Sequence, residues 1–225
     1  MAKLCVALDV EYSRARKLLK SLSGLPIVVK VGPKLFLEAG RDICKAVKEE
    51  GFELFLDLKL HDIPNTVRLA VEQAQKIGAD YLTLHTLGGR EMLREAVSAG
   101  NSINLLGVTL LTSHDEEYMK FLKSSFPSVE DMVIYLAEQA REAGLDGVVC
   151  SAGEVRKVKE KTSLFTVVPG IRLSSRRHDQ KRVYGPKEAV KEGADMIVMG
   201  RDIYLSSEPK KVVEDVLNLI LSAEN

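Results

Sequence analysis

Eight short apolar runs recur along the chain, and each is followed by a longer segment whose apolar residues have helical spacing. Short, almost continuously apolar runs are typical of strands in a parallel sheet that is buried on both faces. Eight such strands alternating with helices in 225 residues predict an α/β protein, a single (β/α)8 TIM barrel with one domain over residues 1–225. The predicted strands are Leu4 to Asp9, Ile27–Val31, Phe52–Leu56 with its continuation to Lys59, Tyr81–His85, Leu105–Leu111, Gly147–Cys150, Leu164–Val168 and Met196–Met199.

The segments between these runs predict helices. A Gly-Ala-Asp or Gly-Leu-Asp triplet begins at Gly78, Gly144 and Gly193, which suits a helix C-cap that leads into a strand. A doubly wound open sheet is the alternative architecture, but no G-x-G-x-x-G follows the first run. The predicted helices are Tyr12–Leu22, Pro33 to Glu50, Asn65–Ile77, Arg90–Ala99, Val129–Ala143, Ala152–Lys159 and Lys210–Leu221.

The charge balance argues against nucleic-acid and membrane partners. Lys and Arg number 32 and are matched by 32 Asp and Glu, so no net charge attracts a polyanion or an anionic membrane surface. The first residues are too short for a secretory apolar region, and no apolar run approaches the roughly 20 residues of a membrane span. The three cysteines have no C-x-x-C spacing, which disfavours a zinc site or a disulfide framework. We therefore expect a soluble cytoplasmic protein.

The stretch from Asp57 to Thr66 follows the third run and places charged residues at the end of an apolar strand. Side chains alternate along a strand, so Asp57 and Lys59 share a face and stand roughly 7 Å apart. Asp62 follows the strand, and Pro64 suits the first turn of a helix. A surface ion pair is the ordinary interpretation of such a pair. At the end of a buried strand, however, charges are costly unless they are paired or used, which favours a catalytic site.

In a barrel, the carboxyl ends of all eight strands meet at one mouth, where active sites lie. Two aspartates and two lysines from the first three strands are therefore expected to converge there. The predicted strand-end residues are Asp9, Lys30, Asp57 with Lys59, His85, Thr112, Arg172 and Gly200-Arg201.

A phosphate site is predicted beside this cluster, because barrels often hold phosphate with the loops after strands seven and eight. Pro169-Gly170-Ile171-Arg172 and Gly200-Arg201 occupy those positions with small residues and guanidinium groups. The polar segment 173–184 is either a lid over the site or a solvated basic loop.

These residues resemble a known family. Asp57-x-Lys59-x-x-Asp62 lies within D-L-K-L-H-D-I-P-N-T, preceded by Asp9 and Lys30 and followed by the two phosphate-site motifs. The whole pattern, from Leu4 to the last helix, closely resembles orotidine 5′-phosphate decarboxylase. The D-x-K-x-x-D core alone is shared with related barrel enzymes that act on sugar phosphates, whereas the extension from His61 to Thr66 is more specific.

The resemblance implies decarboxylation of orotidine 5′-phosphate to UMP, the last step of de novo pyrimidine nucleotide synthesis, with no metal and no cofactor. It implies that Lys59 donates the proton, that Asp57 faces the substrate carboxylate, and that Lys30 and Asp62 complete a charged array. It also implies a homodimer in which Asp62 and Thr66 reach the partner's site. The implied substrate-binding positions are Asp9, Lys30 and Thr66 at the ribose, Arg172, Gln180, Gly200 and Arg201 at the phosphate, and Ile63 and Thr112.

Two alternatives remain open. The first is another enzyme of the same barrel group, a 3-keto-gulonate 6-phosphate decarboxylase or a hexulose-phosphate synthase, which would need Mg2+. The second is a non-catalytic sensor of a phosphate ligand on a degenerate barrel. The extension from Ile63 to Thr66 counts against the first alternative, and the intact set of Asp57, Lys59 and Asp62 counts against the second.

Overall fold

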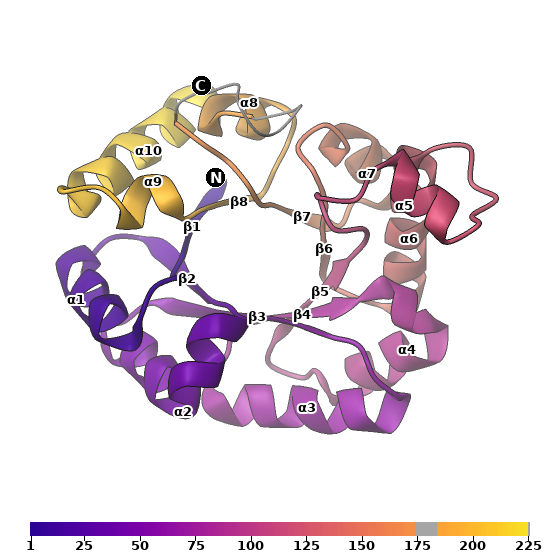
Figure 1. Cartoon of the computed structure of the whole chain (residues 1–225), viewed down its shortest axis with the longest axis horizontal. Helices are drawn as coiled ribbons and strands as arrows, with labels where there is room; N and C mark the ends of the chain where they lie inside the picture. The colour runs from indigo at the N-terminus through magenta and orange to yellow at the C-terminus, as the bar shows by residue number, and fades with distance from the viewer. Residues whose placement is uncertain (174–183, 225) are drawn as a thin grey trace.

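The eight strands pair in parallel in chain order, and β8 pairs with β1 to close a barrel (Figure 1). This computed structural model describes residues 1–173 and 184–224. The prediction of a (β/α)8 barrel is confirmed. Gln180 and most of the polar segment after the seventh strand lie outside the described residues. The strands are β1 Lys3–Ala7, β2 Ile27–Val31, β3 Glu53–Leu60, β4 Tyr81–His85, β5 Asn104–Val108, β6 Gly147–Val149, β7 Phe165–Val168 and β8 Met196–Met199.

The helices surround the strands as an outer ring (Figure 1). Those described are α1 Tyr12–Leu22, α2 Pro33–Glu49, α3 Pro64–Ile77, α4 Gly89–Ala99, α5 Glu116–Phe121, α6 Val129–Ala143, α7 Val155–Thr162, α8 Pro186–Lys191, α9 Arg201–Tyr204 and α10 Pro209–Glu224, with a 3-10 turn at Thr86–Gly88. In the described part of the chain, no helix is both long and apolar enough to span a membrane.

The side chains of β3 show how the barrel sorts its residues. Leu54 and Leu56 pack outwards into the large cluster between strands and helices. Phe55 points inwards and joins a smaller cluster within the barrel, with Cys5 and Val28 from the two preceding strands. The predicted alternation of faces is therefore confirmed, and the next inward residue after Phe55 is Asp57.

The three predicted glycine caps each precede an aspartate that ties two strands together. Gly78 and Gly144 adopt left-handed conformations at the ends of α3 and α6, where a glycine meets little steric cost. The aspartate that ends each triplet accepts a hydrogen bond from a backbone amide near the start of the preceding strand. The three bonds run from Leu54 N to Asp80 Oδ2 at 2.6 Å, from Leu105 N to Asp146 Oδ2 at 2.8 Å and from Thr166 N to Asp195 Oδ2 at 2.7 Å.

Some element bounds differ from the predictions. The fifth strand ends at Val108 rather than Leu111, and a turn carries the chain from there into α5. The helix predicted to begin at Ala152 begins at Val155, because the preceding residues form a turn in which Ser151 N donates to Glu154 Oε2 at 2.8 Å.

Candidate active site

Asp57 lies at the centre of the candidate site, on the inner face of β3 at the carboxyl end of the barrel. Asp57 is 9% exposed, and each of its two carboxylate oxygens forms an ion pair with a lysine ammonium. Lys30 Nζ from β2 lies 3.1 Å from Oδ2, and Lys59 Nζ lies 2.8 Å from Oδ1. Thr83 from β4 donates its hydroxyl hydrogen to Oδ1 at 2.9 Å. Three adjacent strands therefore converge on one carboxylate.

Lys59 departs from regular strand geometry. Its φ is +50°, in the left-handed region that residues with a side chain rarely adopt, and the pairing of β3 with β4 shifts register between Leu56 and Leu60. In a regular strand residues two apart are separated by about 7 Å, yet the Lys59 side chain folds back so that its ammonium meets Asp57. Backbone strain of this kind is typical of functional sites.

The electrostatics keep this group charged. Burial raises the pKa of Asp57, but Lys30, Lys59 and the hydrogen bonds to Lys59 and Thr83 outweigh it, so the pKa lies below its usual value. Burial lowers the pKa of Lys30, but the nearby Asp57 and Asp9 raise it above its usual value. The site therefore presents an ordered array of opposite charges at neutral pH.

Asp9 lies just beyond β1 and borders the same array. A Cβ atom placed on Gly32 would lie 3.5 Å from both Asp9 Oδ1 and Lys30 Nζ, so the two charged ends lie against the same glycine. Asp9 is exposed, whereas the Lys30 side chain is largely buried. The predicted convergence of the first three strands is confirmed for Asp9, Lys30, Asp57 and Lys59.

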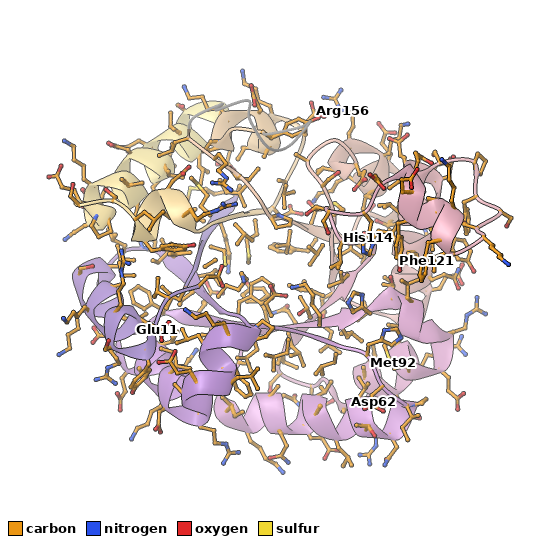
Figure 2. The ribbon with its side chains drawn as sticks, in the orientation of Figure 1. Glu11, Asp62, Met92, His114, Phe121 and Arg156 are labelled. Carbon is orange, nitrogen blue, oxygen red and sulfur yellow. The ribbon has the colours of Figure 1, made fainter. Side chains whose placement is uncertain are left out.

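Asp62, Ile63 and Thr66 lie apart from this array. Figure 2 shows Asp62 out at the ring of helices, near the start of α3. All three residues are exposed, and Asp62 Oδ1 accepts a hydrogen bond from Ile63 N at 2.7 Å. Within residues 1–173 and 184–224, Asp62 forms no ion pair with Lys59. A single chain therefore does not bring Asp62 into its own array.

The loops after β7 and β8 are joined at the same mouth. Ile171 N donates to Val198 O at 3.4 Å, and Leu173 N donates to Asp202 Oδ2 at 2.8 Å. Gly170 has a φ of +79°, which a glycine adopts without strain. Arg172 is half-buried in the first of these loops, and Arg201 follows Gly200 as an exposed residue at the start of α9.

Thr112 lies in the exposed turn after β5. Beside it, the mouth carries imidazoles that the charged motif does not include. The His61 and His85 rings lie 5.5 Å apart, and His114 stacks on Tyr118 with ring centroids 3.6 Å apart. His85 Nδ1 is buried and has no hydrogen-bond partner in the described part of the chain. Burial, His61, Lys59 and His114 lower the pKa of His85, so its ring is held neutral beside the lysine.

A family model described as "Orotidine 5'-phosphate decarboxylase / HUMPS family" matches residues 2–216, which include the whole of this site. The chain belongs to this family. The orotidine 5'-phosphate decarboxylase of Aquifex aeolicus (strain VF5) is 51% identical over 228 residues, covering 98% of this chain and 99% of the relative. The enzyme of the same name from Methylacidiphilum infernorum (isolate V4) is 43% identical, covering 96% of each chain.

Solved structures of the orotidine 5'-phosphate decarboxylase family agree with the fold. The crystal structure of orotidine 5'-phosphate decarboxylase from Lactobacillus acidophilus matches with a TM-score of 0.86 at 35% identity. That match covers 98% of this chain and 99% of the other. The enzyme from Pyrococcus horikoshii OT3 matches with a TM-score of 0.79 at 29% identity. The barrel fold of this chain is therefore shared with solved members of the family.

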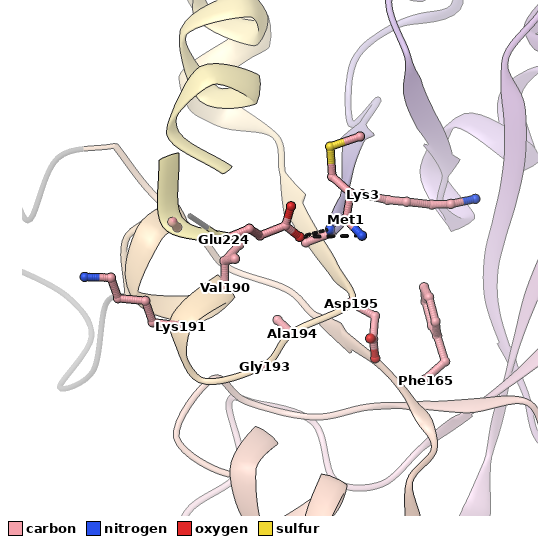
Figure 3. Close-up of a pocket in the computed structure, with 11 residues that line it drawn as sticks. Met1, Lys3, Phe165, Val190, Lys191, Gly193, Ala194, Asp195 and Glu224 are labelled. Atoms are coloured by element: carbon pink, nitrogen blue, oxygen red, sulfur yellow. Dashed lines mark hydrogen bonds and ion pairs between the residues drawn. The ribbon is translucent and has the colours of Figure 1, made fainter. Parts of the chain in front are cut away.

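One cleft lies at the opposite end of this family member's barrel. It encloses about 440 Å³ and is lined by the amino ends of β1, β7 and β8, as Figure 3 shows for Lys3, Phe165 and Asp195. Two of the charged residues that line it are paired with residues outside its lining: Lys3 Nζ lies 2.7 Å from Glu53 Oε2, and Lys159 Nζ lies 2.5 Å from Asp195 Oδ2. Active sites of such barrels lie at the carboxyl end, so we place the candidate functional site at the mouth and not in this cleft.

The described residues offer no metal site, but they include one contact at the mouth that the sequence did not predict. In residues 1–173 and 184–224 no group of three or more His, Cys, Asp and Glu side chains has a geometry that could hold a metal ion. Sequence reasoning missed Thr83, which contacts the array directly. The only sequence signal for it was a polar residue at an inward position of an otherwise apolar strand.

Proposed function

We propose that this protein decarboxylates orotidine 5′-phosphate to UMP at the carboxyl end of its barrel. The observation that carries the proposal is the alternating array of Lys30, Asp57 and Lys59, held in one inward-facing group by charge and hydrogen bonds. The family and the names of its relatives support the substrate. The same array is suited to a reaction in which negative charge develops on a carbon atom.

In the proposed reaction, the bond between C6 of the pyrimidine and its carboxylate breaks. Carbon dioxide leaves without the bonding electron pair, which stays on C6. Lys59 then transfers an ammonium proton to C6, which gives UMP, and it regains a proton from solvent. The ion pair with Asp57 orients the Lys59 ammonium, which suits it to stabilise the developing charge before it donates the proton.

Asp57 and Lys30 support this step in different ways. Asp57 faces the substrate carboxylate, and its charge favours departure of carbon dioxide because like charges repel. Its pKa below the usual value keeps it ionised for that role. Lys30 balances Asp57 from the other side and is also placed to contact the ribose together with Asp9.

Binding energy from the phosphate helps to organise the reacting end. Arg201 and Gly200 after β8, and Arg172 after β7, form the proposed phosphate grip, since the two loops are hydrogen-bonded to each other at the mouth. Gln180 is the fourth proposed contact and lies outside the described residues. Thr112 is the proposed contact from the turn after β5.

The proposed working unit is a homodimer with shared sites. Asp62 and Thr66 are exposed, and Asp62 lies out at the ring of helices (Figure 2), so each is available to a neighbouring barrel mouth. Exposed apolar side chains accompany them: Ile63 is 66% exposed and Phe121 is 79% exposed. Figure 2 shows Asp62 and Phe121 on the side of the barrel formed by α3, α4 and α5. Exposed apolar residues near a functional loop are typical of an interaction surface.

The second candidate belongs to the same family, whose description also covers HUMPS enzymes. Those act on sugar phosphates and would require Mg2+. The extended motif from Ile63 to Thr66 favours the nucleotide substrate. A chelator therefore separates the two candidates, since only the sugar-phosphate reaction depends on a divalent cation.

The test is the change in ultraviolet absorbance when purified protein is mixed with orotidine 5′-phosphate, with and without EDTA. We expect turnover that EDTA does not change. Loss of activity in EDTA and its recovery with Mg2+ would assign the protein to the sugar-phosphate branch. Absence of turnover on both substrate classes would favour a non-catalytic ligand sensor.

A further inference from the structure

Thr83 closes a ring of hydrogen bonds around Lys59. The Lys59 backbone N–H donates to Thr83 Oγ1 at 2.9 Å, and this hydroxyl donates to Asp57 Oδ1 at 2.9 Å. The Lys59 ammonium donates to the same Asp57 oxygen at 2.8 Å. The two ends of one lysine, its backbone and its ammonium, are thus both tied to Thr83 and Asp57.

The Thr83 hydroxyl is buried and lies at a strained point of the backbone. Thr83 has no exposed surface, so water does not replace the bonds if the hydroxyl is lost. Lys59 is the residue with the left-handed φ of +50°, and the pairing of β3 with β4 shifts register there. A residue with a side chain is strained in this region and persists there only where its surroundings hold it. Thr83 is the side chain that engages the strained amide.

We propose that Thr83 is a positioning residue for the decarboxylation, in that its one hydroxyl fixes the backbone of Lys59 and the carboxylate of Asp57 together and so aims the Lys59 ammonium at the substrate carbon. The inference rests on the proposed function, because it assigns Thr83 to the same proton transfer. Thr83 acts through Lys59 and Asp57 and does not itself exchange a proton with substrate.

The proposal carries a pH signature. The charged and titratable groups around Asp57 are Lys30 from β2, Lys59 from β3, His85 from β4 and Cys5 from β1. The Thr83 hydroxyl adds a hydrogen bond to the ionised carboxylate, which favours the charged form. Loss of that hydroxyl therefore raises the pKa of Asp57, and the acid limb of the kcat profile moves to higher pH.

The test compares Thr83→Val, which keeps the side-chain shape but lacks the hydroxyl, with Thr83→Ser, which keeps the hydroxyl. We expect Thr83→Val to lower kcat by about 10- to 100-fold, the effect of a lost hydrogen bond to a charged group, with KM and UMP binding unchanged. Thr83→Ser is expected to restore most of kcat and the original acid limb. Thr83→Ala serves as a second variant without the hydroxyl if the valine variant does not fold.

Thr166→Val is the matched control. Thr166 is also fully buried, and its hydroxyl also bonds a carboxylate, that of Asp195 at 3.1 Å, but it lies at the other end of the barrel. Its loss should reduce stability and leave kcat and the pH profile unchanged. Wild-type values of kcat and acid limb in Thr83→Val, or a serine variant as slow as the valine variant, would overturn the positioning role. Failure of the wild-type protein to convert orotidine 5′-phosphate would instead refute the proposed function.

Discussion

At the scale of single residues, Lys59 combines an unfavourable backbone conformation with a demanding chemical role. A glycine at this position would adopt a φ of +50° without strain but would remove the ammonium that meets Asp57. The backbone is therefore strained at a position that needs an ammonium group, because an unstrained glycine has no side chain to supply one. This conformation was not predictable from the sequence, because the pattern from Phe52 onwards indicates only a continuous strand.

Arg201 should contribute to binding rather than to the chemical step. Replacing Arg201 with alanine removes the guanidinium that we propose contacts the phosphate, and we expect substrate binding to weaken by about 1.5–3 kcal/mol, with a smaller effect on kcat. The measurement is kcat and KM for orotidine 5′-phosphate. Arg41→Ala is the control, since Arg41 is an exposed arginine on the outer helix α2. Normal substrate binding by Arg201→Ala would show that the phosphate site is misplaced.

His85 should make stability depend on pH. The pKa of His85 is lowered in the folded state. Below about pH 6.5, its ordinary pKa, the unfolded chain therefore binds a proton at His85 that the folded chain does not bind. Stability should therefore fall as pH decreases below about 6.5, and it should fall less in His85→Asn. The lowered pKa of Asp57 also contributes stability. That contribution is lost only below about pH 4, so it does not mask the effect of His85.

Urea unfolding at about pH 7.5 and about pH 5.5 measures this difference for the wild-type and variant proteins. The free energy of unfolding of the wild-type protein should decrease more between the two conditions. An equal decrease in both proteins would show that His85 titrates normally.

At the scale of elements, the spacing of apolar residues predicted the bounds correctly where a segment was long or fully apolar. The bounds predicted for Tyr12–Leu22, Val129–Ala143 and Tyr81–His85 agree with α1, α6 and β4. The four residues of α9 and the six of α8 were missed, because so few residues cover less than two turns and leave no periodic signal. The apolar run to Leu111 overran β5, since hydrophobicity alone does not mark where pairing stops.

The aspartates that tie neighbouring strands should stabilise the barrel. Asp146→Ala leaves the Leu105 N–H without its 2.8 Å acceptor, and we expect a loss of about 1–2 kcal/mol in the free energy of unfolding. Asp146→Asn retains an oxygen acceptor and should lose less. Asp42→Ala, at an exposed position of α2, should change stability by no more than about 0.5 kcal/mol. Urea unfolding measures all three, and equal effects at Asp146 and Asp42 would refute the role.

At the scale of the whole molecule, the site was predictable to the extent that topology places strand ends together. Asp9 follows β1, Lys30 and Asp57 lie in β2 and β3, and the barrel itself brings the three residues to one mouth. Strand topology alone did not place Asp62, which follows β3, and only the family resemblance implied that it reaches the site of a partner subunit. Its outward position in the folded chain is what makes a shared site a specific proposal.

Subunit exchange tests that proposal. Lys59→Ala and Asp62→Ala proteins are each expected to be inactive. In a shared-site heterodimer one site is doubly damaged and the other is intact, so mixing should restore activity to about one quarter of the sites at random exchange. Mass measurement establishes that exchange occurred. An exchanged mixture that stays inactive would show that Asp62 does not act across the interface.

The closure of β8 on β1 determines when the barrel can be completed during synthesis. Lys3 pairs with Met196, so one hydrogen-bonded seam joins opposite ends of the chain, and its formation carries a large loop-closure entropy. Until β8 leaves the ribosome, β1 presents an open edge with no partner on that side. Pairing between strands so distant in sequence slows folding, and an uncovered strand edge favours aggregation until its partner strand arrives.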